Sequence, residues 1–206
     1  WIRSGQDRRI LLVGAEIQSP GLDVSTAGRD TAVIFGDGAG VAILGPTDDP
    51  GRGVLSAHLF SDGRHAEQLW MDGPGLSHVP WISTEMLEDG RARIKMEGRE
   101  VFKHATTKMP GSVQIALQAN GLATSDIKLL IAHQANLRIS EMVQKQLALR
   151  DDQVFNNIQR YGNTTAASIP IALDEALQQG RLHRGELLVL TAFGSGFTWG
   201  SAAIRW

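Results

Sequence analysis

The segment Leu187-Leu-Val-Leu-Thr-Ala-Phe193, followed by Gly194-Ser-Gly196, decides the fold more than any other part of the chain. An uncharged run with a single hydroxyl predicts a strand that is buried on both faces of a sheet. The glycines then predict a tight turn into a last strand that runs toward Trp206. Such a strand belongs to a sheet that helices cover, which indicates an α/β protein.

Helix and strand patterns alternate before this strand. Ile169, Leu173 and Leu177 have the spacing of one helical face, and Gly180 ends that helix. Pro110 is expected to kink an earlier helix. The predicted elements are a helix over 100–120, a strand over 127–131, a helix over 137–149, a brief strand at 154–155 and a helix over 166–179. This order predicts a mixed sheet with helices packed on its faces.

The first half of the chain is richer in strands and loops. Residues 9–14 form a short apolar run that predicts a strand buried on both faces. Strands are also predicted over 31–35, 41–44 and 54–60, the first two joined by Gly36-Asp-Gly-Ala-Gly40. Residues 61–90 lack a clear period, so we expect loops there, with one short helix near 83–87. A long irregular stretch of this kind is often part of a binding surface.

Composition excludes several classes of protein. The 206 residues carry 20 Lys and Arg against 22 Asp and Glu, a formal net charge of -2, which disfavours non-specific nucleic-acid binding. The 42% of hydrophobic residues indicates a globular chain. No apolar run approaches the ~20 residues of a membrane span, and the start lacks a signal-peptide core, so we expect a cytoplasmic protein. The absence of cysteine excludes disulfides and a thiol nucleophile within these residues.

Three polar clusters are predicted at the ends of strands, where open α/β sheets place their ligand sites. They are His133-Gln-Ala-Asn136, Tyr161-Gly-Asn-Thr-Thr165 and Gly194-Ser-Gly-Phe-Thr-Trp-Gly200. Each also has a purely structural interpretation. His133 could orient a strand-to-helix turn that Asn136 caps, Asn163 could adopt a left-handed turn conformation, and the glycines could form only a hairpin.

Competing catalytic motifs do not match. The glycine segment is not G-x-G-x-x-G and lacks the Lys-Ser/Thr pair of a phosphate loop. Ser195 is not in a G-x-S-x-G nucleophile elbow, because phenylalanines stand two residues away on each side. The six histidines show no close ligand spacing, so we expect no metal.

Taken together, the clusters resemble β-ketoacyl-acyl-carrier-protein synthase III, one of the thiolase-fold condensing enzymes. The resemblance is carried by HQAN at 133–136, GNTTAAS at 162–168 and FGSGFTWGSA at 193–202, with support from IFGDGAG at 34–40 and EGREVFK at 97–103. It implies a thiolase-like layered α-β-α-β-α fold with mixed sheets, incomplete at the N-terminus. Residues 1–94 would end the N-terminal half and add tunnel-entrance loops, and residues 95–206 would form the C-terminal half.

The resemblance also implies a chemistry. The family uses a Cys-His-Asn triad, in which the cysteine takes an acyl group from acyl-coenzyme A and malonyl on an acyl carrier protein is decarboxylated to attack it. His133 matches the histidine and Asn163 the asparagine, whose N–H groups would stabilise the enolate that decarboxylation leaves. The backbone N–H of Ser195 would help form a second oxyanion hole.

Substrate and partner contacts follow from the same resemblance. Asn136, Phe193 and Gly194 match substrate-binding positions, and no cofactor is implied beyond the coenzyme A thioester that serves as substrate. A homodimer is expected. A basic residue that contacts coenzyme A in family members aligns near Pro20, which is a departure from the pattern. The positions that match basic residues around the tunnel mouth, where the acidic carrier protein binds, are Lys103, Arg138 and Lys145; their alternative interpretation is solvated helix charges.

The main departure is the nucleophile. The cysteine of the family would precede the position matched by Trp1, and nothing in these residues replaces it. The first hypothesis is therefore the C-terminal part of a synthase III-type acyltransferase of fatty acid biosynthesis, inactive by itself. The alternatives are a secondary-metabolite enzyme of the same family and a catalytically silent partner subunit. His133 and Asn163 argue against the silent subunit, which has no chemical need for the pair.

Overall fold

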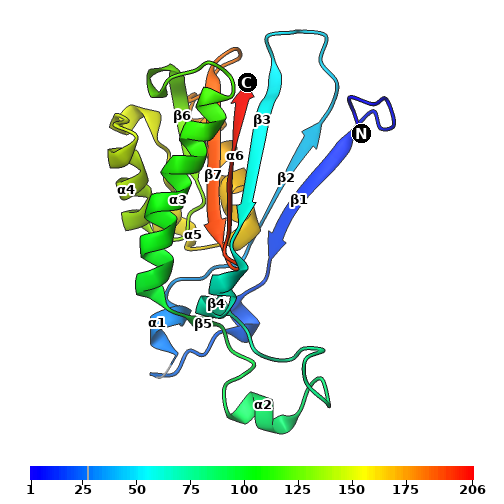
Figure 1. Ribbon diagram of the computed structural model, residues 1–206, viewed down its shortest axis with the longest axis vertical. Helices are drawn as coiled ribbons and strands as arrows, with labels where there is room; N and C mark the ends of the chain where they lie inside the picture. Colours follow the sequence, from blue (N-terminus) through cyan, green and yellow to red (C-terminus); the bar gives the residue numbers. More distant parts are fainter. Residues whose placement is uncertain (27) are drawn as a thin grey trace.

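The computed structural model describes residues 1–26 and 28–206, and its largest element is a four-stranded sheet (Figure 1). The strand order is β3-β8-β7-β6. Strands β6 and β7 are parallel, whereas β8 is antiparallel to both of its neighbours. The bounds are Gly53–Ser61 for β3, Ile127–Ala132 for β6, Leu187–Gly194 for β7 and Thr198–Arg205 for β8. The predicted mixed sheet is confirmed, and the segment that begins at Leu187 is one of its two inner strands.

Two helices cover one face of this sheet. They are α3 (Gly98–Gln118) and α4 (Leu137–Gln146), both close to their predicted positions. α3 continues as one helix through Pro110. Its apolar side packs with Val189 of β7 and with Phe197 in the turn between β7 and β8, both fully buried. Burying such side chains stabilises the fold by roughly 1.5–3 kcal/mol each, so this layer fixes the position of the strand ends.

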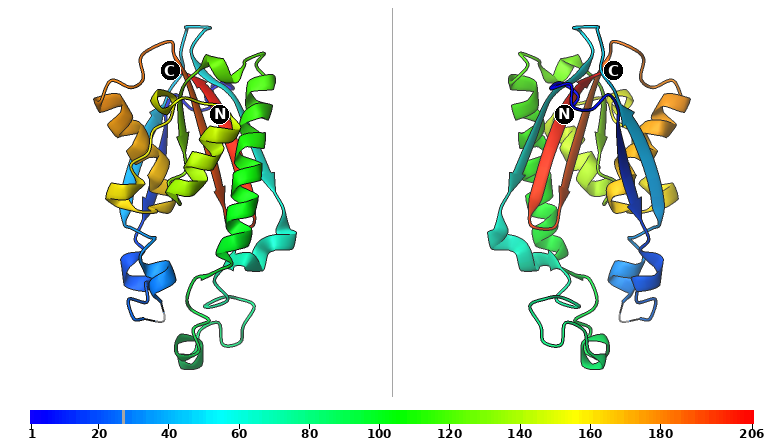
Figure 2. Two further views of the ribbon diagram at one scale, coloured as in Figure 1. Left: turned by 90° about the vertical axis from the view of Figure 1, so that its left-hand side faces the viewer. Right: turned by 90° about the vertical axis from the view of Figure 1, so that its right-hand side faces the viewer.

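A third long helix, α6 (Ser168–Gln178), lies between the four-stranded sheet and a second, two-stranded sheet (Figure 2). The second sheet pairs β1 (Ile10–Glu16) with β2 (Gly38–Leu44) in antiparallel register. Ala172 and Ala176 pack on Leu129 and the other apolar residues on the second face of the large sheet. The layers follow the order helices, sheet, helix, sheet, in agreement with the predicted layered α/β fold.

Close packing between α6 and the small sheet explains why glycines recur in this sheet. A Cβ added at Gly40 would lie 2.7 Å from Cβ of Pro170 at the start of α6. A Cβ at Gly38 would lie 2.9 Å from Cδ1 of Ile171. Both distances are too short for real carbon contacts, so the glycines let the layers approach. Gly38 and Gly40 therefore have a structural role, which is to pack β2 against α6.

The other face of the small sheet is exposed, contrary to the expectation of a strand buried on both faces. Leu11 pairs with Ile43 and Val13 with Val41, which places all four side chains on one face. They are 57–71% exposed. The run around Val13 thus forms the predicted strand, but within the described residues only α6 and the segment before it cover this sheet.

We expect this exposed face to drive self-association when the 206-residue chain is produced alone. Contiguous apolar patches on sheets are aggregation surfaces. Placing charges there, as in the double variant Leu11→Lys with Ile43→Glu, should raise the fraction of monomer in size-exclusion chromatography. A soluble monomer for the unchanged chain would contradict this prediction.

The predicted strand over residues 31–35 is wrong. The chain forms a short helix, α1 (Arg29–Ala32), followed by a turn, and only Phe35 makes a single parallel bridge, to Asn163. Thr31 stabilises the helical turn, because its Oγ1 donates to the carbonyl of Gly28 at 3.0 Å. A short apolar run does not distinguish strand from helix by itself, and here the local hydrogen bond of Thr31 and tertiary contacts decide.

The irregular segment after β3 contains more structure than predicted. The short helix near residues 83–87 is confirmed as α2 (Thr84–Glu88), with Ser83 accepting a hydrogen bond from the Met86 N–H. The sequence did not predict the small two-stranded antiparallel sheet of β4 (Leu69–Trp70) and β5 (Lys95–Met96). Figure 1 places β4 and β5 at the end of the sheet where β7 ends. This segment therefore flanks the polar clusters.

The remaining elements are short. The expected strand at 154–155 is reduced to one bridge between Leu130 and Val154. Within residues 1–26 and 28–206, none of the helices combines the length and hydropathy of a membrane span. The short helices not yet described are Ser19–Gly21, Gly63–Gln68, Thr124–Asp126, Asp151–Gln153, α5 (Ile158–Tyr161) and Thr165–Ala167.

Candidate active site

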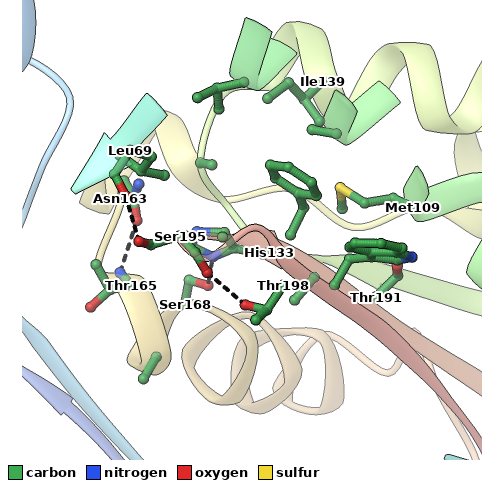
Figure 3. A pocket seen from close by; sticks show the side chains of 18 of the residues that line it. Leu69, Met109, His133, Ile139, Asn163, Thr165, Ser168, Thr191, Ser195 and Thr198 are labelled. Atoms are coloured by element: carbon green, nitrogen blue, oxygen red, sulfur yellow. Dashed lines mark hydrogen bonds between the residues drawn. The ribbon is translucent and has the colours of Figure 1, made fainter. Parts of the chain in front are cut away.

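Residues of all three polar clusters line one cavity (Figure 3), although only two of the clusters follow a strand, because the segment before Asn163 forms a short helix. His133 follows β6, Ser195 follows β7, and Asn163 lies on the loop after α5. The cavity has a volume of about 1140 Å³ and is mostly apolar, with Met109, Ile139 and other side chains of α3 and α4 in its walls. An apolar cavity with a few converging polar groups is the usual form of a small-molecule site.

His133 is held at both its backbone and its ring. Its N–H donates to the carbonyl of Thr191 at 2.8 Å, and its Nδ1 lies 2.6 Å from Oγ of Ser168. Nε2 has no hydrogen-bond partner within the part of the chain that the structure describes. Burial lowers the pKa of His133 to about 4, so the imidazole is neutral at pH 7.

Asn163 is fixed by its backbone and by one end of its amide. Its N–H donates to Ile34 at 2.8 Å and its carbonyl accepts from Gly36 at 2.9 Å. Oδ1 accepts from the N–H of Thr165 at 2.9 Å, so the amide is held with Nδ2 as its other end. Nδ2 has no partner among the described residues and is available to the cavity. The side chain is 7% exposed, so its orientation is set by the protein rather than by solvent.

The backbone around Asn163 departs from the turn that the structural interpretation required. The positive φ values belong to Gly162 (68°) and Thr165 (45°), not to Asn163. A β-branched residue at positive φ is strained, and such strain persists where the surrounding structure determines it. Here it directs the Thr165 N–H back to the Asn163 amide, so the turn serves to orient that side chain.

Ser195 occupies the turn between β7 and β8 and lines the cavity. Its carbonyl accepts from Oγ1 of Thr198 at 2.8 Å, and its Oγ donates to the carbonyl of Leu69 at 2.5 Å. Its backbone N–H has no hydrogen-bond partner in the described residues. The turn is therefore a hairpin, as the structural interpretation held, and also presents a free N–H as an oxyanion hole requires.

The predicted substrate-binding residues also lie on the cavity wall. Phe193 and Gly194 end β7, and Asn136 begins α4. Oδ1 of Asn136 accepts from the Arg138 N–H at 2.9 Å, so this residue caps the helix as its alternative interpretation stated. The cap uses Oδ1, so Nδ2 is the end of the Asn136 amide that remains for the cavity.

The three basic residues are on the outer surfaces of α3 and α4 and are exposed. Lys103 is paired with Glu100 at 3.4 Å, which reduces its local positive charge. Arg138 follows Leu137 at the end of α4 that borders the cavity, while Lys145 lies in the last turn of the same helix. Arg138 therefore lies beside two residues of the cavity wall, Asn136 and Ile139.

The structure adds site residues that the sequence did not single out by role. Ser168 stands within the quoted GNTTAAS motif, but its contact with His133 spans 35 residues. Leu69 holds Ser195 through its backbone carbonyl, an atom that no side-chain pattern in the sequence marks. Oγ1 of Thr165 is buried at the cavity without a partner in the described residues. Among those residues no group of three or more His, Asp or Glu side chains is arranged to hold a metal ion.

Comparison with known proteins agrees with this geometry. The model of the 3-oxoacyl-[acyl-carrier-protein] synthase III C-terminal domain matches residues 117–206, and the companion synthase III model matches residues 1–63. The β-ketoacyl-[acyl-carrier-protein] synthase III of Roseiflexus castenholzii is 48% identical over 205 residues. The alignment covers 100% of this chain and 61% of that relative.

Solved structures show the same relation. The 3-oxoacyl-(acyl carrier protein) synthase III of Pseudomonas aeruginosa PAO1 superposes with a TM-score of 0.86 at 41% identity, covering 100% of this chain and 60% of that one. The priming β-ketosynthase of the R1128 polyketide pathway superposes with a TM-score of 0.84 at 29% identity, covering 98% and 58%.

The fold is thiolase-like, as in these solved structures, and one cavity brings His133 and Asn163 together. The chain belongs to the β-ketoacyl-acyl-carrier-protein synthase III family. It spans 61% of the length of the Roseiflexus relative.

Proposed function

We propose that the whole protein carrying these residues joins an acyl-coenzyme A primer to malonyl-acyl carrier protein, with loss of carbon dioxide, at the start of fatty acid biosynthesis. The observation that carries this proposal is a pair of side-chain nitrogens at one cavity, Nε2 of His133 and Nδ2 of Asn163, that have no hydrogen-bond partner among residues 1–26 and 28–206 as described. Both belong to groups whose other polar atoms are already bonded. Two preorganised donors suit a developing oxyanion.

The decarboxylation step explains why two donors are needed. The bond between the malonyl methylene and its carboxylate breaks, carbon dioxide leaves, and the electron pair passes to the thioester oxygen as an enolate. His133 and Asn163 donate hydrogen bonds to that oxygen in the low-dielectric cavity, where such bonds are stronger than in water. The enolate carbon then forms a bond to the carbonyl carbon of the enzyme-bound acyl thioester, and the backbone N–H of Ser195 stabilises the oxyanion of that adduct. The adduct collapses as its bond to the nucleophile's sulfur breaks, the sulfur leaves as a thiolate, and the β-ketoacyl product is released on the carrier protein.

The acyl group must first be held on a nucleophile. The 206 residues contain no cysteine, so the proposal assigns the thiol to the remainder of the whole protein, as in the family pattern. The chain alone is then inactive. A cytoplasmic homodimer, with residues 1–94 and 95–206 belonging to the two thiolase-like halves, is part of the same proposal.

The proposal is tested by two measurements on the whole protein. Incubation with acyl-coenzyme A primers should add an acyl mass to the protein, and malonyl-acyl carrier protein should then release carbon dioxide and form a β-ketoacyl product. A protein that does neither would refute the proposed function and favour a silent subunit. Product formation only with starter units of a secondary metabolite would favour the polyketide branch.

We expect the carrier protein to bind near Arg138. Carrier proteins are acidic, and rim charges act mainly on association and its salt dependence. Arg138→Glu in the whole protein should weaken carrier binding about tenfold at low salt and less at high salt, as measured by titration calorimetry. Acyl transfer from small thioesters should be nearly unchanged.

Arg184→Glu is the matched control, because it makes the same change of charge at an exposed residue before β7, at the opposite end of that strand from the cavity. It should leave carrier affinity unchanged. Equal effects of the two substitutions would reject the local assignment and leave only a general charge effect.

A further inference from the structure

A chain of three polar groups leads from the backbone to the imidazole of His133. The N–H of Gln134 donates to Oγ of Ser168 at 3.3 Å, and the same Oγ lies 2.6 Å from Nδ1 of His133. Ser168 is 2% exposed, so solvent does not compete for its hydroxyl. The hydroxyl therefore has two partners of different chemical kinds, a fixed donor and a ring nitrogen.

Counting protons decides the direction of the second bond. A backbone N–H can only donate, so Gln134 occupies a lone pair of the Ser168 oxygen. The hydroxyl has a single proton of its own, and within the described residues the acceptor available to that proton is Nδ1 of His133. If Nδ1 carried its own proton, the hydroxyl would accept twice and its proton would be buried without a partner, which costs about 1–3 kcal/mol. Nδ1 is thus the acceptor.

The ring is neutral at pH 7, so one tautomer must be chosen. With Nδ1 accepting, the proton of the neutral imidazole is on Nε2, the nitrogen that has no partner in the described chain. In the other tautomer, Nε2 would present a lone pair to the cavity and would repel an enolate oxygen. The tautomer therefore determines whether His133 helps or opposes the proposed reaction.

Ser168 has no competing structural duty at the start of α6. The residue preceding the helix is Ala167, and the helix shows no side-chain capping bond. The Ser168 hydroxyl is accordingly directed away from the helix backbone, toward His133 and Gln134. Ser168 is the first residue of α6 and not its N-cap, so its hydroxyl is not needed for capping and is available to His133 and Gln134.

We propose that Ser168 is a positioning residue whose hydroxyl holds His133 in the Nε2–H tautomer, so that this nitrogen donates to the enolate oxygen. The role of the tautomer in stabilising the enolate rests on the proposed function, but the tautomer itself can be observed without any reaction. Holding a catalytic histidine in the wrong tautomer can lower the rate by up to about 10⁴-fold, so the group that sets the tautomer strongly affects the rate.

The first test is the wild-type spectrum. The whole protein is labelled with ¹⁵N-histidine, and long-range ¹H–¹⁵N correlations are recorded at pH 7, with His133→Gln used to assign the signals. We expect Nε2 of His133 to have the shift of a protonated nitrogen and Nδ1 that of an unprotonated one. The opposite pattern, or a doubly protonated ring, overturns the proposal even if every variant misfolds.

The second test uses variants. Ser168→Ala should give a mixture of tautomers and slow carbon dioxide release from malonyl-acyl carrier protein at least about tenfold, with little change in KM. Ser168→Thr, which keeps a hydroxyl, should keep the Nε2–H tautomer and the wild-type rate of carbon dioxide release. Ser140→Ala is the matched control, because Ser140 is also buried and donates to Asn156 at 2.6 Å, away from the cavity.

The outcomes separate the two proposals. An unchanged tautomer and rate in Ser168→Ala would reduce Ser168 to a packing residue. A wild-type protein with the expected tautomer but no release of carbon dioxide would refute the proposed function and leave the hydrogen-bond inference standing. An equal loss of rate in Ser140→Ala would indicate general destabilisation and would also overturn the assignment.

Discussion

Asn163→Ala in the whole protein should still form the acyl-enzyme but should decarboxylate malonyl-acyl carrier protein about 10²–10³ times more slowly than the wild type. The reason is that Nδ2 is a donor held in place by three other bonds of the same residue, to Ile34, Gly36 and Thr165. Losing one preorganised oxyanion donor costs about 3–4 kcal/mol of barrier. The substitution removes no acid or base, because a neutral amide is neither.

The two half-reactions are followed separately. Intact-protein mass spectrometry measures acylation, and trapping of labelled carbon dioxide measures decarboxylation. Asn120→Ala is a suitable control, because the Asn120 amide is bonded to Ser56 and Ala116 and does not line the cavity. If Asn163→Ala decarboxylates at the normal rate, the amide only shapes its turn.

The free energy of unfolding should fall by about 3 kcal/mol through His133 alone as the pH drops from above 6.5 to below 4. Burial lowers the pKa of this imidazole from 6.5 to about 4. Between those values the unfolded chain binds the proton and the folded protein does not, so acid favours unfolding. The contribution is constant above pH 6.5 and below pH 4, and it changes in between.

Urea unfolding of the whole protein at a series of pH values tests this prediction. Burial also lowers the pKa of His104, with smaller effects from His65 and nearby lysines, so the wild-type slope contains both residues. His133→Gln should reduce the slope between pH 6.5 and 4, whereas His183→Gln, at an exposed loop residue, should leave it intact. An unchanged slope in His133→Gln would mean that solvent reaches the ring.

The parts of the fold that could be predicted from sequence are those with strong local patterns. The uncharged run from Leu187, which glycines end, correctly predicted a buried strand, and the spacing of Ile169, Leu173 and Leu177 along one helical face predicted α6. Residues 31–35 were misassigned because five apolar and β-branched residues fit a strand or a turn of helix equally well. Contacts of Thr31 and Phe35 with other residues decided between them.

For the site as well, some features could be predicted from the sequence and others could not. His133 and Asn163 could be proposed from motifs, since their side-chain chemistry is visible in the sequence. Their orientation could not, because it depends on groups far along the chain, such as the Ile34 carbonyl and the Ser168 hydroxyl. The tether of Ser195 to the Leu69 carbonyl spans 126 residues and uses a backbone atom, which no sequence pattern marks.

The most direct measurement is a crystal structure of the whole protein with a non-decarboxylating malonyl-thioester analogue. We predict that the thioester oxygen lies within about 3.2 Å of both Nε2 of His133 and Nδ2 of Asn163, as two hydrogen bonds require. A thioester oxygen bonded to neither nitrogen, with the analogue ordered in the cavity, would contradict the assignment of these residues to decarboxylation.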